Sequence, residues 1–404
     1  MSRYRLYPTP AQEDVLLGHC AHARYVWNLA VEQRGSWQPG RPAPGYAEQC
    51  RQLSQARAAF PWLAEGSAIV QQQALRDFHA AHASWLAALG RWRKRYVKAS
   101  AQQRPTPPRQ PGFRKQGLDE GFRIVGTGLQ DVRRLNRRWA QVRIPKLGWV
   151  RLRLSRPVPP AKSYRVTRDR AGRWHVAFAA VPPPIPGPST GEVVGIDRGV
   201  RVTLALSDGR TYQAHAGRDV KRLQRRLARA KRGSKRRAKV KVQLARLYAR
   251  NADARRDWAE KASTEIARHY DLIRLEDLDV SSMTCSARGT AGQLGCHVGQ
   301  KAGLNRSILR SAWGKFATRL EHKARGRVEK VNPAYTSQRC SRCGIVDREA
   351  RESQAVFRCR SCGYRANADH NAARNIAAGH AARGGLASAE PTNREPQLVA
   401  SSGT

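Results

Sequence analysis

The chain has 404 residues and a formal charge of +45, from 75 Lys and Arg against 30 Asp and Glu. Such self-repulsion opposes a compact state unless a polyanion neutralises it, so a nucleic acid is the expected partner. The length excludes a small disulfide scaffold. No run of 18 apolar residues occurs and the opening segment has no apolar core, so we expect a cytoplasmic, nucleoid-associated protein with no membrane partner.

The first part of the chain is expected to combine a short strand, a helical segment and a β segment. Residues 1–10 are predicted to form an edge strand that is ended by two prolines. In residues 12–97 the apolar positions recur at helical spacing. In residues 121–180 apolar and polar positions alternate as they do in strands. Proline-rich boundaries are predicted at 104–113 and 181–191.

The second part of the chain is expected to alternate strands and helices. The predicted elements are a strand-turn-strand unit (192–214), a pair of helices (218–269), a short buried strand (270–280), a mobile turn-rich loop (281–299), an amphipathic helix (305–326) and a strand (327–333). The small and polar tail after residue 380 is predicted to be disordered.

The predicted helix pair is strongly basic. Residues 218–256 contain 17 Lys or Arg and two acidic residues, and Gly233-Ser234 separates the two helices. There are too few acidic residues to pair with these cations in salt bridges on the helix surface, so we expect the cations to contact phosphates. The candidate nucleic-acid-binding residues are Lys221, Arg222, Arg225, Arg226, Arg229, Lys231, Arg232, Lys235, Arg236 and Arg237.

Four of the eight cysteines are clustered in two Cys-x-x-Cys pairs. They are Cys340, Cys343, Cys359 and Cys362. This spacing is typical of a four-cysteine zinc ribbon, and the glycine after each pair suits a knuckle turn that needs positive φ. A closed site of four thiolates has no open coordination position, so the Zn²⁺ is expected to be structural.

Three isolated acids lie beside predicted core elements of the basic chain. Asp197 and Glu276 each end an apolar run, and Asp369 precedes a segment that is predicted to begin a helix. Any one of them alone is more often a turn former or a helix cap than a functional residue. Together they could hold two divalent cations, such as Mg²⁺.

Several motifs resemble one known family. In order along the chain they are "GIDRGV", "LEDL", "TSQRCSRCG", "FRCRSCGY" and "ADHNAARNI". Together with "RYRLYPTPAQ" and "LNRSILRSAWGKFATRLEHKA" they resemble the TnpB family of transposon-encoded RNA-guided endonucleases, relatives of type V CRISPR effectors, over most of residues 3–379. The resemblance implies an α/β RNase H-like (RuvC) nuclease with an inserted four-cysteine zinc ribbon, and an N-terminal β wedge domain with a helical recognition insertion.

The resemblance also implies a division into domains. These are a wedge (1–10 and 119–185), a helical recognition lobe (11–118), a RuvC-like nuclease (191–335 and 364–380), a zinc ribbon that binds target nucleic acid (336–363) and a disordered tail (381–404).

By position, the resemblance implies that Asp197, Glu276 and Asp369 are catalytic and hold Mg²⁺, with Asp197 bridging both ions. Glu276 is preferred to its neighbour Asp277 because it comes first in the Glu-Asp-Leu motif, and Asp279 is a further alternative. The implied partners are a guide RNA from the transposon end and a double-stranded DNA target.

The chain departs from the family pattern in two places. Arg198 occupies a position that is often apolar, and strand alternation predicts that it turns away from Asp197. Asn367-Ala368 replaces a common Asp-Arg. Two other functions stay open at this point: a transposase that acts directly on transposon ends, and an RNA-guided DNA-binding repressor that does not cleave.

Overall fold

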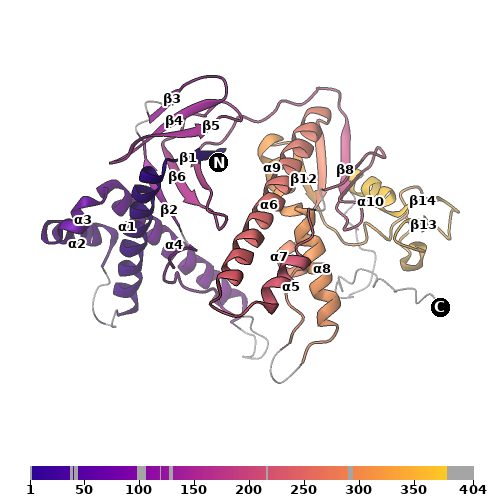
Figure 1. The fold of residues 1–404 in the computed structure, drawn as a ribbon. Coiled ribbons are helices and arrows are strands. Elements are labelled where there is room, and N and C mark those ends of the chain that lie inside the picture. The colour runs from indigo at the N-terminus through magenta and orange to yellow at the C-terminus, as the bar shows by residue number, and fades with distance from the viewer. Residues whose placement is uncertain are drawn as a thin grey trace. The chain divides into compact units, whose positions relative to one another are not determined.

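The computed structural model describes residues 2–36, 40, 44–97, 106–118, 120–126, 131–214, 217–289 and 294–379 (Figure 1). The chain divides into two compact units, one of residues 1–181 and 220–249 and the other of residues 182–219 and 250–404. The predicted disordered tail, 381–404, and part of the predicted mobile loop, 290–293, lie outside the described residues. Within the described residues, no helix has the length and apolar character needed to cross a membrane.

The first unit is built on an antiparallel sheet of seven strands in the order β2-β6-β7-β1-β5-β4-β3. The strands are β1 (Ser2–Tyr7), β2 (Gly121–Val125), β3 (Val132–Arg134), β4 (Trp139–Ile144), β5 (Gly148–Arg153), β6 (Ser163–Arg168) and β7 (Trp174–Phe178). β1 pairs with β5 on one side and β7 on the other, so the prediction of an edge strand is wrong. Pro8 and Pro10 follow the strand, where they remove no hydrogen bond from its ladders.

Four helices follow β1 in the first unit. They are α1 (Pro10–Gly35), α2 (Tyr46–Ala59), α3 (Pro61–Glu65) and α4 (Ala68–Arg95), which confirms the helical spacing of this region. α1 begins with a capping box in which Thr9 and Gln12 each accept a hydrogen bond from the other's backbone N–H. Apolar side chains of the helices and the sheet form one core, where Trp27 and Phe78 pack edge to face with ring centroids 5.5 Å apart.

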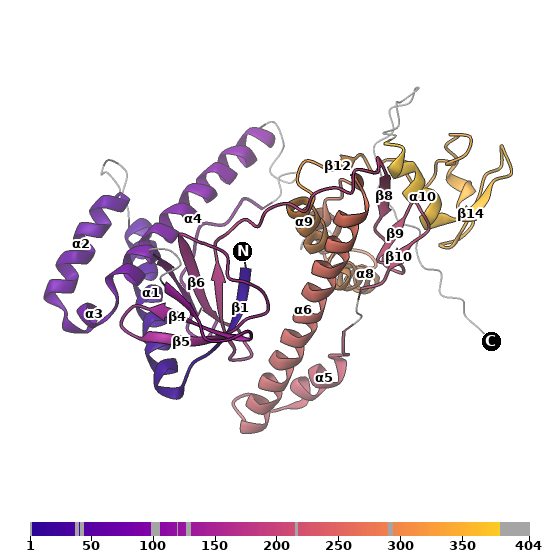
Figure 2. The ribbon, with the colours of Figure 1, turned by 90° about the horizontal axis from the view of Figure 1, so that it is seen from above.

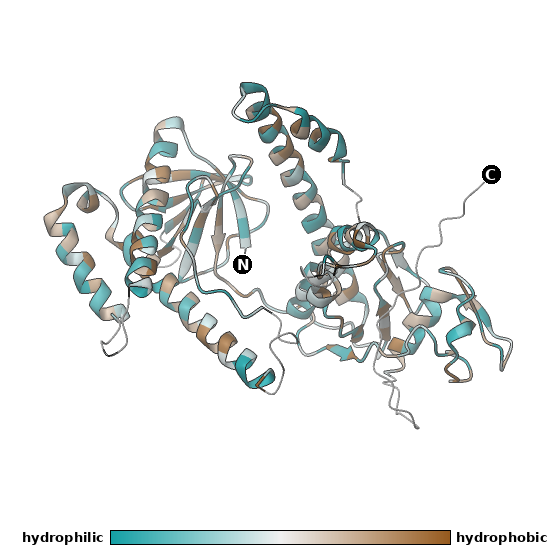
Figure 3. Cartoon of the chain, turned by 90° about the horizontal axis from the view of Figure 1, so that it is seen from below, coloured by the Kyte–Doolittle hydropathy of each residue, from teal (hydrophilic) through white to brown (hydrophobic). Residues whose placement is uncertain are grey.

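The basic segment forms two helices, as predicted. α5 (Lys221–Arg229) and α6 (Lys235–His269) are separated by a turn in which Gly233 has φ 83°. Arg237 donates to the carbonyl oxygen of Ala230 at 2.9 Å and so satisfies the C-terminal end of α5. Figure 3 shows hydrophilic residues prevailing along this pair.

The second unit contains a mixed sheet of five strands in the order β10-β9-β8-β11-β12 (Figures 1 and 2). The strands are β8 (Val193–Asp197), β9 (Leu204–Leu206), β10 (Thr211–Tyr212), β11 (Leu272–Glu276) and β12 (Val328–Val331). β8, β9 and β10 form an antiparallel meander, whereas β11 runs parallel to both β8 and β12. This order and these directions are those of an RNase H-like fold, as expected.

The second unit also contains helices. They are the C-terminal half of α6, the short α7 (Val280–Met283), α8 (Val298–Ser311), α9 (Trp313–Lys323) and α10 (Ala368–Ala377). Of these, α6, α9 and α10 pack on this sheet. The prediction of one helix over 305–326 is wrong, because Ala312 has φ 58° and separates α8 from α9. The small ribbon hairpin consists of β13 (Val356–Arg358) and β14 (Arg365–Asn367), and a 3-10 turn spans Arg348–Ala350.

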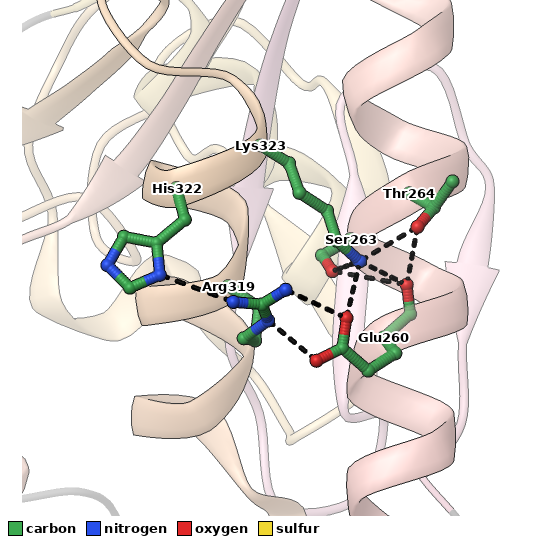
Figure 4. A network of polar contacts seen from close by, with 6 residues as sticks. All are labelled: Glu260, Ser263, Thr264, Arg319, His322 and Lys323. Atoms are coloured by element: carbon green, nitrogen blue, oxygen red, sulfur yellow. Dashed lines mark hydrogen bonds and ion pairs between the residues drawn. The ribbon is translucent and has the colours of Figure 1, made fainter. Parts of the chain in front are cut away.

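A partly buried polar network joins α6 to α9 (Figure 4). The Lys323 ammonium lies 2.8 Å from the Glu260 carboxylate and donates to the hydroxyls of Ser263 and Thr264 at 2.9 and 2.8 Å. Arg319 pairs with the same carboxylate at 2.6 Å. Burial acts to raise the pKa of Glu260, but Lys323 and Arg319 outweigh this effect and hold the pKa below its usual range. The network therefore links α6 to α9 through side-chain contacts.

Candidate active site and zinc ribbon

Asp197 and Glu276 lie side by side at one edge of the second sheet. β8 and β11 are parallel, and their register pairs Ile196 with Leu275, the residues just before the two acids. Both strands therefore deliver a carboxylate at their C-terminal ends, the edge where open α/β sheets place their sites. Asp197 is half-buried and Glu276 is buried.

Asp369 reaches the same edge from the first turn of α10, because this helix packs directly on β8. The contact is so close that a Cβ added to Gly195 would lie 2.1 Å from the carbonyl oxygen of Ala373 and 2.2 Å from the backbone nitrogen of Ala377. Only glycine on the strand and small residues on the helix permit this approach. The structure thus brings all three predicted acids together.

Asp197 is the carboxylate on which the charges of the other two act. Burial, then the charges of Glu276 and Asp369, raise the pKa of Asp197 well above its usual value. Burial also raises the pKa of Asp369, against the opposing charges of Arg351 and Arg201. Arg351 lies 3.3 Å from an Asp369 oxygen and belongs to the segment between the two cysteine pairs. Such an acidic cluster is stabilised by bound cations.

The acids beside Glu276 have other partners. Asp277 is exposed and lies 3.5 Å from the Lys330 ammonium. Asp279 caps α7, where its carboxylate accepts from the backbone N–H of Ser282 at 3.1 Å. Glu276 instead is buried, and its carboxylate accepts from the Thr336 hydroxyl at 2.6 Å. Its placement favours Glu276 over both alternatives.

The two departures from the family pattern have structural roles. Arg198 is buried, and its guanidinium donates to the backbone carbonyl oxygen of Glu276 at the end of β11. Burial lowers the pKa of Arg198, against the charges of Glu276 and Asp197. Asn367 caps α10 by accepting from the backbone N–H groups of Asp369 and His370 at 3.0 and 3.2 Å. Asn367 thus helps to fix the turn that carries Asp369.

The four predicted cysteines form one compact group in which all four sulfur atoms lie within 4.8 Å of one another. In the described part of the chain, no other set of three His, Cys, Asp or Glu ligand atoms is grouped in this way. The Sγ atoms of Cys340 and Cys362 are 3.7 Å apart, and those of Cys343 and Cys359 are 3.6 Å apart. Zn–S bonds of about 2.3 Å in a tetrahedron give S–S edges of about 3.8 Å, so the geometry fits zinc.

The two ribbon knuckles repeat one backbone pattern. Gly344 donates to the carbonyl oxygen of Cys340 at 2.9 Å, and Gly363 donates to that of Cys359 at 3.0 Å. Both glycines have positive φ, 81° and 70°, as predicted. The backbone N–H of Cys362 is the main cause that lowers the pKa of Cys359, while the neighbouring cysteines help to raise the pKa of Cys343, as expected when four thiols share one site.

Comparison with known proteins identifies the family. The "Probable transposase" model matches residues 163–287, the "Cas12f1-like, TNB domain" model residues 313–376 and a "Helix-turn-helix domain" model residues 2–38. InsQ of Escherichia coli K12, provisionally named an RNA-guided DNA endonuclease, is 34% identical over 94% of this chain and 92% of its own length. The chain belongs to the TnpB family.

Other known proteins are also similar to this chain. A protein of Streptomyces pristinaespiralis with the same provisional activity is 30% identical over 94% of this TnpB chain and 89% of its own. Among solved structures, a Cas12f1–sgRNA–target DNA complex is similar at 15% identity and a TM-score of 0.46, over 91% of this chain and 83% of that one. Where the helix-turn-helix model matches, residues 2–36 of this TnpB chain form β1 and the single helix α1.

The basic helices of this TnpB chain present most of the predicted nucleic-acid-binding residues to solvent. Nine of the ten candidates are exposed. The tenth, Arg237, is partly buried, and its guanidinium is occupied by the carbonyl oxygens of α5. A capping role therefore accounts for Arg237, whereas contacts of the other nine with phosphates stay a prediction.

Sequence reasoning did not find four residues around the acids: Arg351, Thr336, Asn371 and Asn375. The two asparagines are fully buried or nearly so, with 0% and 2% of their surface exposed, on a helix otherwise rich in alanine. Amide side chains four residues apart on such a helix were a usable signal, because buried polar groups need partners.

Proposed function

We propose that this TnpB chain is a transposon-encoded, RNA-guided DNA endonuclease that hydrolyses phosphodiester bonds by a two-metal mechanism with Mg²⁺. The observation that carries the proposal is the placement of three carboxylates from distant segments at one edge of an RNase H-like sheet. Two relatives that span nearly the whole chain have names that describe this activity. The charge of +45 supports nucleic acid as partner and substrate.

In this proposal the carboxylates are the Mg²⁺ ligands, since Mg²⁺ prefers carboxylate oxygens. Asp197 would be shared by both ions because it is the acid on which the charges of both Glu276 and Asp369 act. Glu276 and Asp369 would each hold one ion. When bound, the ions would activate a water molecule and stabilise the leaving oxygen.

Arg351 is proposed to act in the same site. Its guanidinium lies 3.3 Å from Asp369 and its charge also acts on Asp197. When cations neutralise the acids, this guanidinium would be able to stabilise the negative charge that develops on the phosphate in the transition state. The ribbon would therefore contribute a group to the nuclease site in addition to holding structural zinc.

Guide RNA and double-stranded target DNA are the proposed partners. The exposed Lys and Arg of α5 and the N-terminal part of α6 would hold the nucleic acid backbone, while pairing with the guide would determine the sequence. The predicted wedge and recognition lobe would contact guide and target, and the ribbon would help to hold the target beside the acids.

Two other functions predict different behaviour. An RNA-guided repressor has no need for clustered acids, whereas this chain has all three, and burial opposes the charged form of Asp197 and Asp369. A transposase acting directly on DNA ends needs no RNA. The presence or absence of an RNA requirement therefore separates the proposal from this second alternative.

The test begins with RNA that co-purifies with the protein, which is sequenced and used to design a matched plasmid. Cleavage in Mg²⁺ is compared between the matched plasmid, one with a scrambled target and the Asp197→Ala variant. We expect cutting of the matched plasmid by wild type alone. Cutting that does not depend on RNA, or joining of transposon ends without RNA, would overturn the proposal.

A further inference from the structure

Glu276 accepts a hydrogen bond from Thr336, the first residue of the predicted zinc ribbon. The Thr336 hydroxyl lies 2.6 Å from a Glu276 carboxylate oxygen and 3.1 Å from the carbonyl oxygen of Pro333. A hydroxyl has one proton, and the shorter contact to a charged acceptor is the stronger one. Thr336 and Glu276 are 4% and 8% exposed, so water does not compete freely for this bond.

Thr336 is itself held by α10. The Asn375 amide donates to the carbonyl oxygen of Thr336 at 2.9 Å and to that of Arg339 at 2.7 Å. Both amide protons are thus used by the segment between β12 and the first cysteine. Because Asn375 is 2% exposed, water could not replace the hydrogen bonds to these two carbonyl oxygens if the amide were removed.

One helical turn earlier, Asn371 binds the ribbon knuckle directly. Its amide donates to the carbonyl oxygen of Arg339 at 2.8 Å and accepts from the backbone N–H of Ser341 at 2.9 Å. These two residues flank Cys340. The asparagine pair therefore joins the first zinc knuckle to the helix whose first turn carries Asp369.

We propose that the zinc knuckle at Cys340 positions two of the acids of the nuclease site. Thr336 orients Glu276, and the asparagine pair fixes both Thr336 and the knuckle to α10, which carries Asp369. Thr336, Asn371 and Asn375 are then positioning residues, and zinc binding supports the geometry in which the acids receive Mg²⁺. This inference rests on the proposed function for the role of the acids.

A pure packing role for the same residues makes a different prediction. If the buried asparagines only dock a helix, replacing them would lower the stability of the protein and leave the metal affinity of the carboxylates unchanged. A residue that orients a metal ligand changes metal affinity, typically by about 10–100-fold, even when the fold survives. Metal dependence therefore distinguishes the two roles.

The central variant is Thr336→Val, which removes the hydroxyl at nearly constant shape. Thr336→Ser keeps the hydroxyl and is the rescue. Thr203→Val is the matched control, since Thr203 is 2% exposed in the same unit and its hydroxyl accepts from the Ala214 backbone at 2.9 Å. The readout is the Mg²⁺ concentration for half-maximal cleavage by the protein with its guide RNA.

We expect this concentration to rise about 10-fold or more for Thr336→Val and Asn375→Leu, and to stay near wild type for Thr336→Ser and Thr203→Val. The double variant Thr336→Val/Asn375→Leu should shift it little further, because both residues act through one contact. Wild-type Mg²⁺ dependence of Thr336→Val, or an equal shift in Thr203→Val, would overturn the inference.

A second readout does not need cleavage of DNA. Fe²⁺ in place of Mg²⁺, with ascorbate and peroxide, cuts the protein chain beside the bound metal. Cutting near Glu276 should require more Fe²⁺ in Thr336→Val than in wild type or Thr336→Ser, and equal cutting would contradict the inference. If the wild type shows no guided DNA cleavage, the proposed function fails, and the chain cutting alone decides the inference.

Discussion

Gly195 of β8 and Ala373 of α10 are in direct backbone contact, and this contact places Asp197 and Asp369 at the same site. A Cβ at position 195 would lie 2.1 Å from the Ala373 carbonyl oxygen. Helix and strand would have to separate to accept it. The geometry of the acids thus depends on the absence of one methyl group.

Gly195→Ala should therefore lower the rate of guided DNA cleavage by about 100-fold or more, since displacements near 1 Å have such effects. It should also lower the unfolding free energy by roughly 1–3 kcal/mol. Gly314→Ala is the control, because Gly314 is helical and has no atom within 4 Å of an added Cβ. The control should be as active as wild type and slightly more stable; full activity of Gly195→Ala would contradict the packing argument.

The raised pKa of Asp197 predicts how metal-free protein responds to pH. Its folded-state pKa lies well above 3.8, so between these values the folded protein binds more protons than the unfolded chain. The unfolding free energy should fall as pH rises through this window, by about 1.4 kcal/mol per unit of pKa shift. Thermal unfolding of Asp197→Asn should show a smaller fall, and Mg²⁺ should stabilise wild type more than the variant. Identical pH profiles would refute this account.

Zinc should be bound at about one ion per chain. Cys340→Ser or Cys359→Ser should lose this zinc and expose the region from β12 to α10 to proteolysis, because the ribbon core is organised around the sulfur atoms. Cys285→Ser is the control, since Cys285 is exposed and outside the cluster. A zinc-free protein that is equally folded and active would contradict the structural role of the ion.

Phosphate contacts by the basic helices predict a change in salt dependence. Changing Arg225, Arg226 and Arg229 to Glu should weaken binding of nucleic acid and flatten its log–log salt slope by about 2–3, because each lost contact contributes roughly 0.7–0.9. The same three positions changed to Lys keep the charge and should keep the slope. Unaltered affinity and slope in the Glu variant would exclude these helices from the interface.

Much of the site could be predicted because each of its acids has a local signature. Asp197 and Glu276 end apolar runs, and parallel strands bring such ends to one edge. The cysteine spacing likewise specified the sulfur cluster. These features depend on residues that are close together in the chain, so they can be recognised in the sequence alone.

Other features depend on long-range placement and left little trace. The central position of β1 results from pairing with strands more than 140 residues away, such as Arg5 with Arg153. The break at Ala312 occurs at a residue that normally favours helix, so propensity gave no warning. Arg351 and Thr336 lie in irregular segments, and only tertiary structure brings them to the acids.

The central claim is that Asp197, Glu276 and Asp369 form one catalytic centre. The most direct test measures cleavage and binding together, on one DNA duplex with the cognate RNA and Mg²⁺, for each Ala variant and for the double variants. Each single variant should lose most of the cleavage, doubles should lose little more because the residues act as a unit, and guided binding should survive. Wild-type cleavage by Asp197→Ala would contradict the nuclease assignment as a whole, and wild-type cleavage by Glu276→Ala would transfer the second ligand to Asp277 or Asp279.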